Sequence, residues 1–80
     1  MNTKEAVANR IIDLVEEKGM TINELGNVAG VNPSTIYSIL GTKSKNPGIV
    51  TIKKLCDAMD ITLLDFFNSD LFSNLEQELE

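Results

Sequence analysis

Hydroxyl-bearing side chains are concentrated in one short segment of this 80-residue sequence, and two lysines follow it closely. The residues in question are Ser34, Thr35, Tyr37, Ser38, Lys43 and Lys45. Hydroxyl groups can exchange hydrogen bonds with base edges and phosphates, and lysines contact phosphate oxygens. These residue types therefore favour binding over bond-breaking chemistry.

The composition also disfavours catalysis. The sequence contains no histidine and one cysteine, Cys56. Neither a zinc site nor a Cys/His nucleophile pair can be built from such a set, and no glycine-rich phosphate loop is present. We therefore expect no enzyme activity, no metal and no cofactor. We interpret Cys56 as a small core residue and not as a redox sensor.

Three helix starts can be recognised from their capping residues. Two are capping boxes, in which a threonine caps the backbone and an acidic residue three positions later reaches back. The third is an asparagine, a favoured N-cap, followed by a proline, which suits the first helical position. The three starts are Thr21–Glu24, Thr62–Asp65 and Asn32-Pro33.

Apolar spacing and glycine positions predict an all-α fold, a compact bundle of five helices without strands. The expected helices span about residues 4–17, 22–29, 33–40, 49–59 and 63–68. We assign residues 1–68 to the domain and 69–80 to an acidic C-terminal tail. In the tail, Leu71, Phe72, Leu75 and Leu79 would share one helical face, so a short sixth helix is the alternative to a frayed end.

The second and third helices are separated only by Gly30-Val31-Asn32. Two short helices joined by a tight turn that contains glycine form a helix-turn-helix. Gly26 is small where the two helices would cross. We therefore expect leucine at this position to overpack the crossing, and alanine to be tolerated because it favours helix.

Several of these segments together resemble the Cro/repressor-type (Xre-like) helix-turn-helix family, from about residue 6 to residue 68. The segments that carry the resemblance are Thr21…Glu24-Leu25, Gly30-Val31-Asn32, Ser34-Thr35-Ile36-Tyr37-Ser38-Ile39, Asn46-Pro47, Thr51-Ile52-Lys53-Lys54-Leu55 and Ile61-Thr62…Phe66-Phe67. The resemblance implies a five-helix domain that inserts its third helix into the major groove of double-stranded DNA, commonly as a dimer. Two features depart from the pattern: Ile22 stands where the family often has a polar residue, and residues 41–46 form a slightly longer stretch.

The third helix would bury Ile36, Ile39 and Leu40 and turn its hydroxyl groups outward. This face has no charged residue, so it could approach DNA, although a merely solvated polar face is the alternative. The predicted DNA contacts lie at the starts of the second and third helices, on the third helix and in the loop after it. They are Asn23, Asn32, Pro33, Ser34, Thr35, Tyr37, Ser38, Lys43 and Lys45.

The net charge of −5 is unevenly distributed. Residues 1–40 sum to −2, residues 41–60 to +2 and residues 61–80 to −5. The acidic balance favours an alternative function, a protein-interaction module such as an antitoxin or adaptor with the same fold. Within the basic stretch, we expect Lys53 to pair with Asp57 one helical turn away and not with phosphate.

The remaining expectations concern partners and location. We expect a transcriptional regulator, most simply a repressor, that forms a weak homodimer through its fifth helix or its tail. No signal peptide or membrane span is evident, and the single cysteine fits a reducing compartment. We therefore expect a cytoplasmic protein without a membrane or small-molecule partner.

Overall fold

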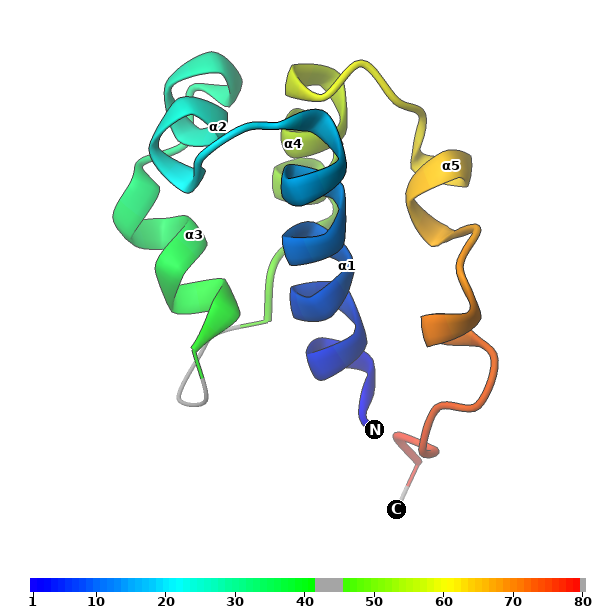
Figure 1. The fold of residues 1–80 in the computed structure, drawn as a ribbon. Helices are drawn as coiled ribbons and strands as arrows, with labels where there is room; N and C mark the ends of the chain where they lie inside the picture. Colours follow the sequence, from blue (N-terminus) through cyan, green and yellow to red (C-terminus); the bar gives the residue numbers. More distant parts are fainter. Residues whose placement is uncertain (42–45, 80) are drawn as a thin grey trace.

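The computed structural model describes residues 1–41 and 46–79, and it is helical without strands over those residues (Figure 1). The elements are α1 (Thr3–Lys18), α2 (Ile22–Ala29), α3 (Pro33–Leu40), α4 (Ile49–Ala58), α5 (Leu63–Phe67) and a short 3-10 turn, η1 (Asp70–Phe72). The five α-helices agree with the predicted ranges to within one residue at each end, which confirms the all-α prediction.

The predicted helix starts are confirmed by their hydrogen bonds. The Thr21 hydroxyl oxygen accepts from the Glu24 backbone N–H, and the Glu24 carboxylate accepts from the Thr21 N–H, both at 3.1 Å. Thr62 and Asp65 form the same capping box at the start of α5. Helix α1 begins with an equivalent box between Asn2 and Glu5, which have the same spacing but were not predicted to cap a helix.

One hydrophobic core holds the helices together. Its largest fully buried side chains come from α1 to α5: Ile11, Leu25, Ile36, Leu55, Cys56 and Phe66. In Figure 1, α2 and α3 lie on one side of α1, and α5 and η1 lie on the other. The prediction that Cys56 is a core residue is confirmed, and its burial raises the pKa of the thiol.

Arg10 fastens α5 to α1. Its guanidinium group donates to the backbone oxygens of Phe66 at 2.7 Å and Asp65 at 2.8 Å. The last carbonyls of a helix have no partner within the helix, so these bonds satisfy acceptors at the end of α5. A helix of only five residues depends on such tertiary contacts for its position.

We expect the substitution Arg10→Ala to lower the free energy of unfolding by about 1–2 kcal/mol, since two charge-assisted hydrogen bonds are lost. Urea unfolding followed by circular dichroism measures this change. Arg10→Lys keeps the charge but cannot reach both carbonyls in the same geometry, and should recover less than half of the loss. Wild-type stability in Arg10→Ala would show that α5 does not depend on this contact.

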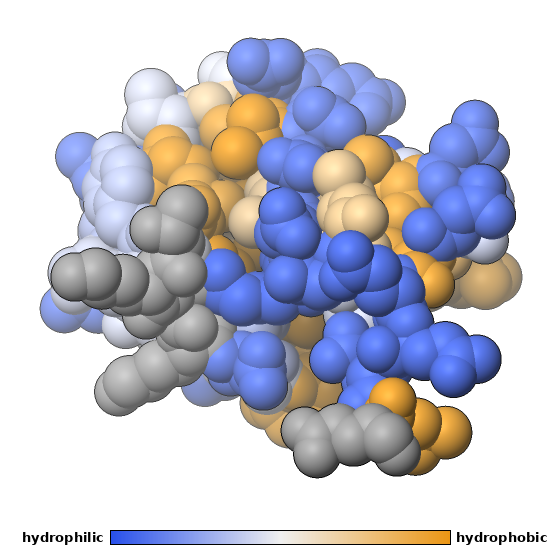
Figure 2. Space-filling model, turned by 90° about the horizontal axis from the view of Figure 1, so that it is seen from below, coloured by the Kyte–Doolittle hydropathy of each residue, from blue (hydrophilic) through white to orange (hydrophobic). Residues whose placement is uncertain are grey.

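The C-terminal tail lies against the start of α1. The Thr3 hydroxyl donates to the Glu78 carboxylate at 2.9 Å, and the Glu76 backbone N–H donates to the Met1 carbonyl at 3.2 Å. Figure 2 shows this end of the molecule, where hydrophilic residues form a broad band between apolar areas. Of the alternative sixth helix, only η1 is formed, and residues 73–79 are not helical.

Gly26 packs against the turn between α2 and α3. A Cβ atom at this position would lie 2.6 Å from the Val31 backbone oxygen and 3.0 Å from Cγ of Pro33. Carbon atoms do not approach a backbone oxygen so closely, and the turn cannot withdraw because the Val31 N–H donates to the Gly26 carbonyl at 3.0 Å. The expectation that alanine is tolerated at Gly26 is therefore wrong: even one methyl group does not fit.

Candidate nucleic-acid interface

The turn between α2 and α3 has the geometry that the sequence predicted. Gly30 ends α2 with φ 69° and ψ 27°, a left-handed conformation that glycine adopts without strain. The Gly30 N–H donates to the Gly26 carbonyl. Asn32 then caps α3, its side-chain oxygen accepting from the Ser34 N–H at 2.9 Å. The two helices are therefore held across a short turn, as a helix-turn-helix requires.

Helix α3 has a buried face and a polar face. Ile36 is fully buried and Ile39 is 3% exposed, so these residues fix the helix to the core. The four hydroxyl-bearing side chains predicted to contact DNA are all exposed: Ser34, Thr35, Tyr37 and Ser38. Tyr37 is the largest of them, and 55% of its surface is accessible. The structure thus brings these four predicted residues together on one accessible helix.

The other predicted contact residues lie in several environments. Asn23 is exposed in the first turn of α2. Asn32 is exposed, but its side-chain amide oxygen caps α3. Pro33 is half-buried and packs toward Gly26, which gives it a structural role. Lys43 and Lys45 lie outside the residues that the structure describes.

The helix-turn-helix unit has almost no charge. Between residues 21 and 41, Glu24 is the only acidic or basic residue, and its carboxylate is held by the Thr21 N–H. A face with so little negative charge can approach a phosphate backbone without strong repulsion. It also supplies no cation of its own, so electrostatic attraction must come from neighbouring segments.

Some cations outside this unit are already engaged. The Lys4 ammonium donates to the Gly41 carbonyl at 2.8 Å and so connects α1 to the end of α3. Lys53 forms an ion pair with Asp57 across one turn of α4, which confirms the prediction for this pair. The Lys4 contact could not be predicted from the sequence, because its acceptor is a backbone oxygen 37 residues away.

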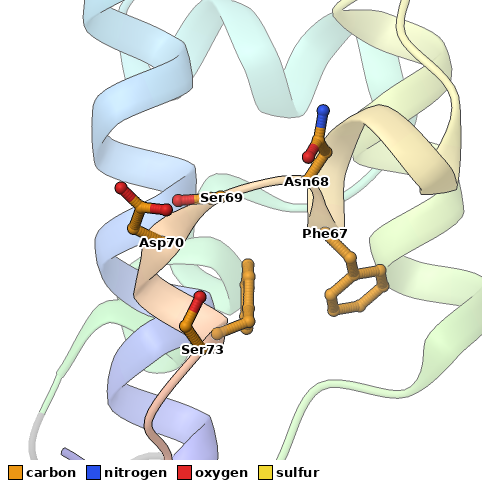
Figure 3. Close-up of a pocket in the computed structure, with 6 residues that line it drawn as sticks. Phe67, Asn68, Ser69, Asp70 and Ser73 are labelled. Atoms are coloured by element: carbon orange, nitrogen blue, oxygen red, sulfur yellow. The ribbon is translucent and has the colours of Figure 1, made fainter.

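A concave surface lies between the end of α5 and η1 (Figure 3). Phe66 is fully buried in the core, and Phe67, which lines this surface, is 38% exposed. The Phe67 and Phe72 rings meet edge to face with centroids 5.1 Å apart. The aromatic side chains therefore pack against one another and anchor η1. Among residues 1–41 and 46–79, no group of acidic, cysteine or histidine side chains could hold a metal ion.

The environment of Asp65 at the start of α5 favours the charged form of its carboxyl group. Its carboxylate accepts hydrogen bonds from the Thr62 backbone N–H at 3.0 Å and is the acidic member of the capping box. These bonds lower the pKa of Asp65 below its ordinary value. The charge therefore serves the helix start, and it lies in α5, outside the helix-turn-helix unit.

Comparison with known proteins agrees with this geometry. The model of the Cro/C1-type helix-turn-helix DNA-binding domain matches residues 10–69. The chain belongs to this family, as the residues of the helix-turn-helix predicted. No curated protein sequence matches the chain.

Solved structures share the fold. Prophage Lp1 protein 11 is 33% identical, with a TM-score of 0.81 over 94% of this chain and 100% of that chain. The SinR protein, in a complex with the SinI protein, is 28% identical with a TM-score of 0.70, over 90% of this chain and 69% of that chain. The restriction-modification controller protein C.Esp1396I, 23% identical over 80% of this chain and 83% of that chain, has the same fold with a TM-score of 0.73. In residues 1–41 and 46–79, no helix has the length and apolar character to cross a membrane.

Proposed function

We propose that the chain is a sequence-specific transcriptional regulator, a repressor, that inserts α3 into the major groove of double-stranded DNA in the cytoplasm. The observation that carries the proposal is the exposed, uncharged polar face of α3 in a domain of the Cro/C1-type family. The major groove admits an α-helix and presents donors, acceptors and thymine methyl groups that such side chains can contact. A repressor of this kind needs only to occupy its operator.

In the proposed complex, the contacts divide into two kinds. Ser34, Thr35 and Ser38 face the base edges, and the Tyr37 ring packs against a sugar while its hydroxyl reaches a phosphate. Asn23 contacts a phosphate together with the free backbone N–H groups at the start of α2. Lys43 and Lys45 meet the phosphates that flank the groove.

Binding of genomic DNA fragments at increasing salt, with sequencing of the retained fragments, tests the proposal. Phosphate contacts release counterions, so the logarithm of the binding constant should fall linearly with the logarithm of salt concentration. The retained fragments should share one short motif. Retention of unrelated fragments, or of none at low salt, would contradict a sequence-specific regulator.

A homodimer is part of the proposal, because one recognition helix contacts few base pairs and paired half-sites raise affinity. Leu64 on α5 is 80% exposed, a large apolar side chain that a second copy could cover. The tail contacts its own α1 through Thr3 and Glu78, so we assign the interface to α5.

We expect Leu64→Glu to make the chain monomeric in sedimentation at high micromolar concentration, because the charge cannot be buried in an apolar interface. A chain that ends at Asn74 should remain dimeric, since it retains Phe72, which packs on the core. If the Leu64→Glu chain sediments as the wild type does, the interface is not at α5.

A protein-interaction module is the second candidate, and two observations favour it. The net charge is −5, and residues 21–41 contain no lysine or arginine. In addition, the 28% identical SinR protein was solved in a complex with another protein. The salt series decides between the two functions, because a module of this kind would retain no DNA even at low salt.

A further inference from the structure

The two serines on the exposed face of α3 donate their hydroxyl protons in hydrogen bonds within the protein. The Ser34 hydroxyl donates to the Asn32 side-chain oxygen at 2.9 Å. The Ser38 hydroxyl donates to the Ser34 backbone oxygen at 3.0 Å, the usual bond of a serine to the preceding helical turn. A hydroxyl has one proton and two lone pairs. In this arrangement, each serine oxygen presents only acceptor capacity to a ligand.

The side chain of Asn32, the residue before α3, is also committed within the protein, in this case through its acceptor oxygen. Its side-chain oxygen already accepts from both the N–H and the hydroxyl of Ser34, each at 2.9 Å. The usual recognition of adenine by asparagine needs the amide oxygen and nitrogen together. With its oxygen occupied, Asn32 cannot make this paired contact while it caps α3.

Guanine is recognised chiefly by donors, because its major-groove edge presents the two acceptors O6 and N7. Arginine and lysine commonly fill this role, and residues 21–41 contain neither. Two other donors are committed elsewhere: the Asn32 side chain holds the cap of α3, and the proposed complex places the Tyr37 hydroxyl at a phosphate. Adenine and cytosine instead present an exocyclic amino group, which needs an acceptor, and thymine presents a methyl group. Ser34 and Ser38 match the amino groups, and the exposed Thr35 has a methyl group that matches thymine.

We infer that α3 selects its operator through the exocyclic amino groups of adenine or cytosine, accepted by Ser34 and Ser38, and through a thymine methyl group against Thr35, and not through guanine O6 and N7. This inference rests on the proposed function, because it assumes that α3 lies in the major groove. It assigns the specificity of the site to accepting oxygens and a methyl group.

Base analogues placed one at a time in the selected operator test the inference. Replacing an adenine or cytosine by the analogue without its amino group, or a thymine by uracil, should weaken binding about tenfold at the contacted positions. Replacing guanines by 7-deazaguanine, which lacks the N7 acceptor, should leave the dissociation constant unchanged. The same analogues in the flanking duplex serve as controls for altered duplex stability.

Matched variants assign each effect to a side chain by a double-mutant cycle. The Ser38→Ala variant should bind the normal operator and the operator without the amino group at one position with the same dissociation constant. Thr35→Ser, which keeps the hydroxyl and removes the methyl group, should lose the sensitivity to uracil. Thr35→Val, which keeps a methyl group, should retain it. These residues are exposed, so circular dichroism should show wild-type folding.

The outcomes separate the inference from the proposed function. If the chain prefers no sequence, the proposed function fails and the inference fails with it. If the chain binds its operator but 7-deazaguanine weakens binding about as much as the other analogues, only the inference is overturned. The inference would also be overturned if the Ser38→Ala and Thr35→Ser variants remained as sensitive to the analogues as the wild type.

Discussion

Replacing Gly26 with alanine is expected to lower the free energy of unfolding by about 1–3 kcal/mol, and leucine is expected to lower it further. The added Cβ would lie 2.6 Å from the Val31 backbone oxygen. Alanine gains about 1 kcal/mol over glycine from helix propensity. This gain cannot offset a displacement of the turn, because the Gly26 carbonyl also holds the Gly30 and Val31 N–H groups.

Thermal unfolding measures the loss as a shift of Tm, about 4–8 °C for each kcal/mol in a domain of this size. Gly41→Ala is the matched control. Among the residues that the structure describes, the nearest atom to its Cβ would be the Tyr37 backbone oxygen at 3.4 Å, an ordinary van der Waals distance. Its φ of −80° suits any residue. A Gly26→Ala chain that melts with the wild type would refute the close approach of the turn to α2.

Removing Lys43 and Lys45 together is expected to weaken DNA binding to every sequence alike. Phosphate contacts position the protein but contain no sequence information, so the operator and random duplex should lose affinity equally. The slope of the salt dependence should flatten by about one unit for each lysine removed. Ser34→Ala and Ser38→Ala should leave this slope unchanged and cost about 1–3 kcal/mol of discrimination between operator and random duplex.

The assay is binding to the selected operator and to random duplex, each across a salt series. Tyr37→Ala should show part of both effects, because the ring and the hydroxyl contact different groups. Lys54→Ala, which removes a cation from α4, is the control for a general change of charge. If the lysine variants lost affinity for the operator alone, the division between phosphate and base contacts would be wrong.

The local structure could be predicted from the sequence because its determinants are short-range. Thr21–Glu24, Asn32-Pro33 and Thr62–Asp65 set three helix starts within a few residues, and the structure confirms each one. The exposed face of α3 followed from the helical period and the burial of Ile36 and Ile39. The family followed from the same residues and is confirmed over residues 10–69.

The features that could not be predicted depend on the distance and direction between residues, which the sequence pattern does not contain. Arg10 and Lys4 donate to backbone carbonyls 56 and 37 residues away, and a carbonyl is not marked by any residue type. The error at Gly26 has a similar origin: helix propensity favoured alanine, whereas the position of the Val31 oxygen excludes it. The hydrogen bonds that the Ser34 and Ser38 hydroxyl groups form within the protein likewise depend on side-chain rotamers, which the sequence does not specify.

The most direct test of the central claim is a titration of the ¹⁵N-labelled chain with the selected operator duplex, followed by amide chemical shifts. We expect the largest changes at the start of α2 and along α3, from Asn32 to Ser38, with small changes in α5 and η1. Random duplex at the same concentration should cause smaller changes in the same region. Changes concentrated in α5 and η1, with α3 unaffected, would contradict the assignment of α3 as the DNA-reading helix.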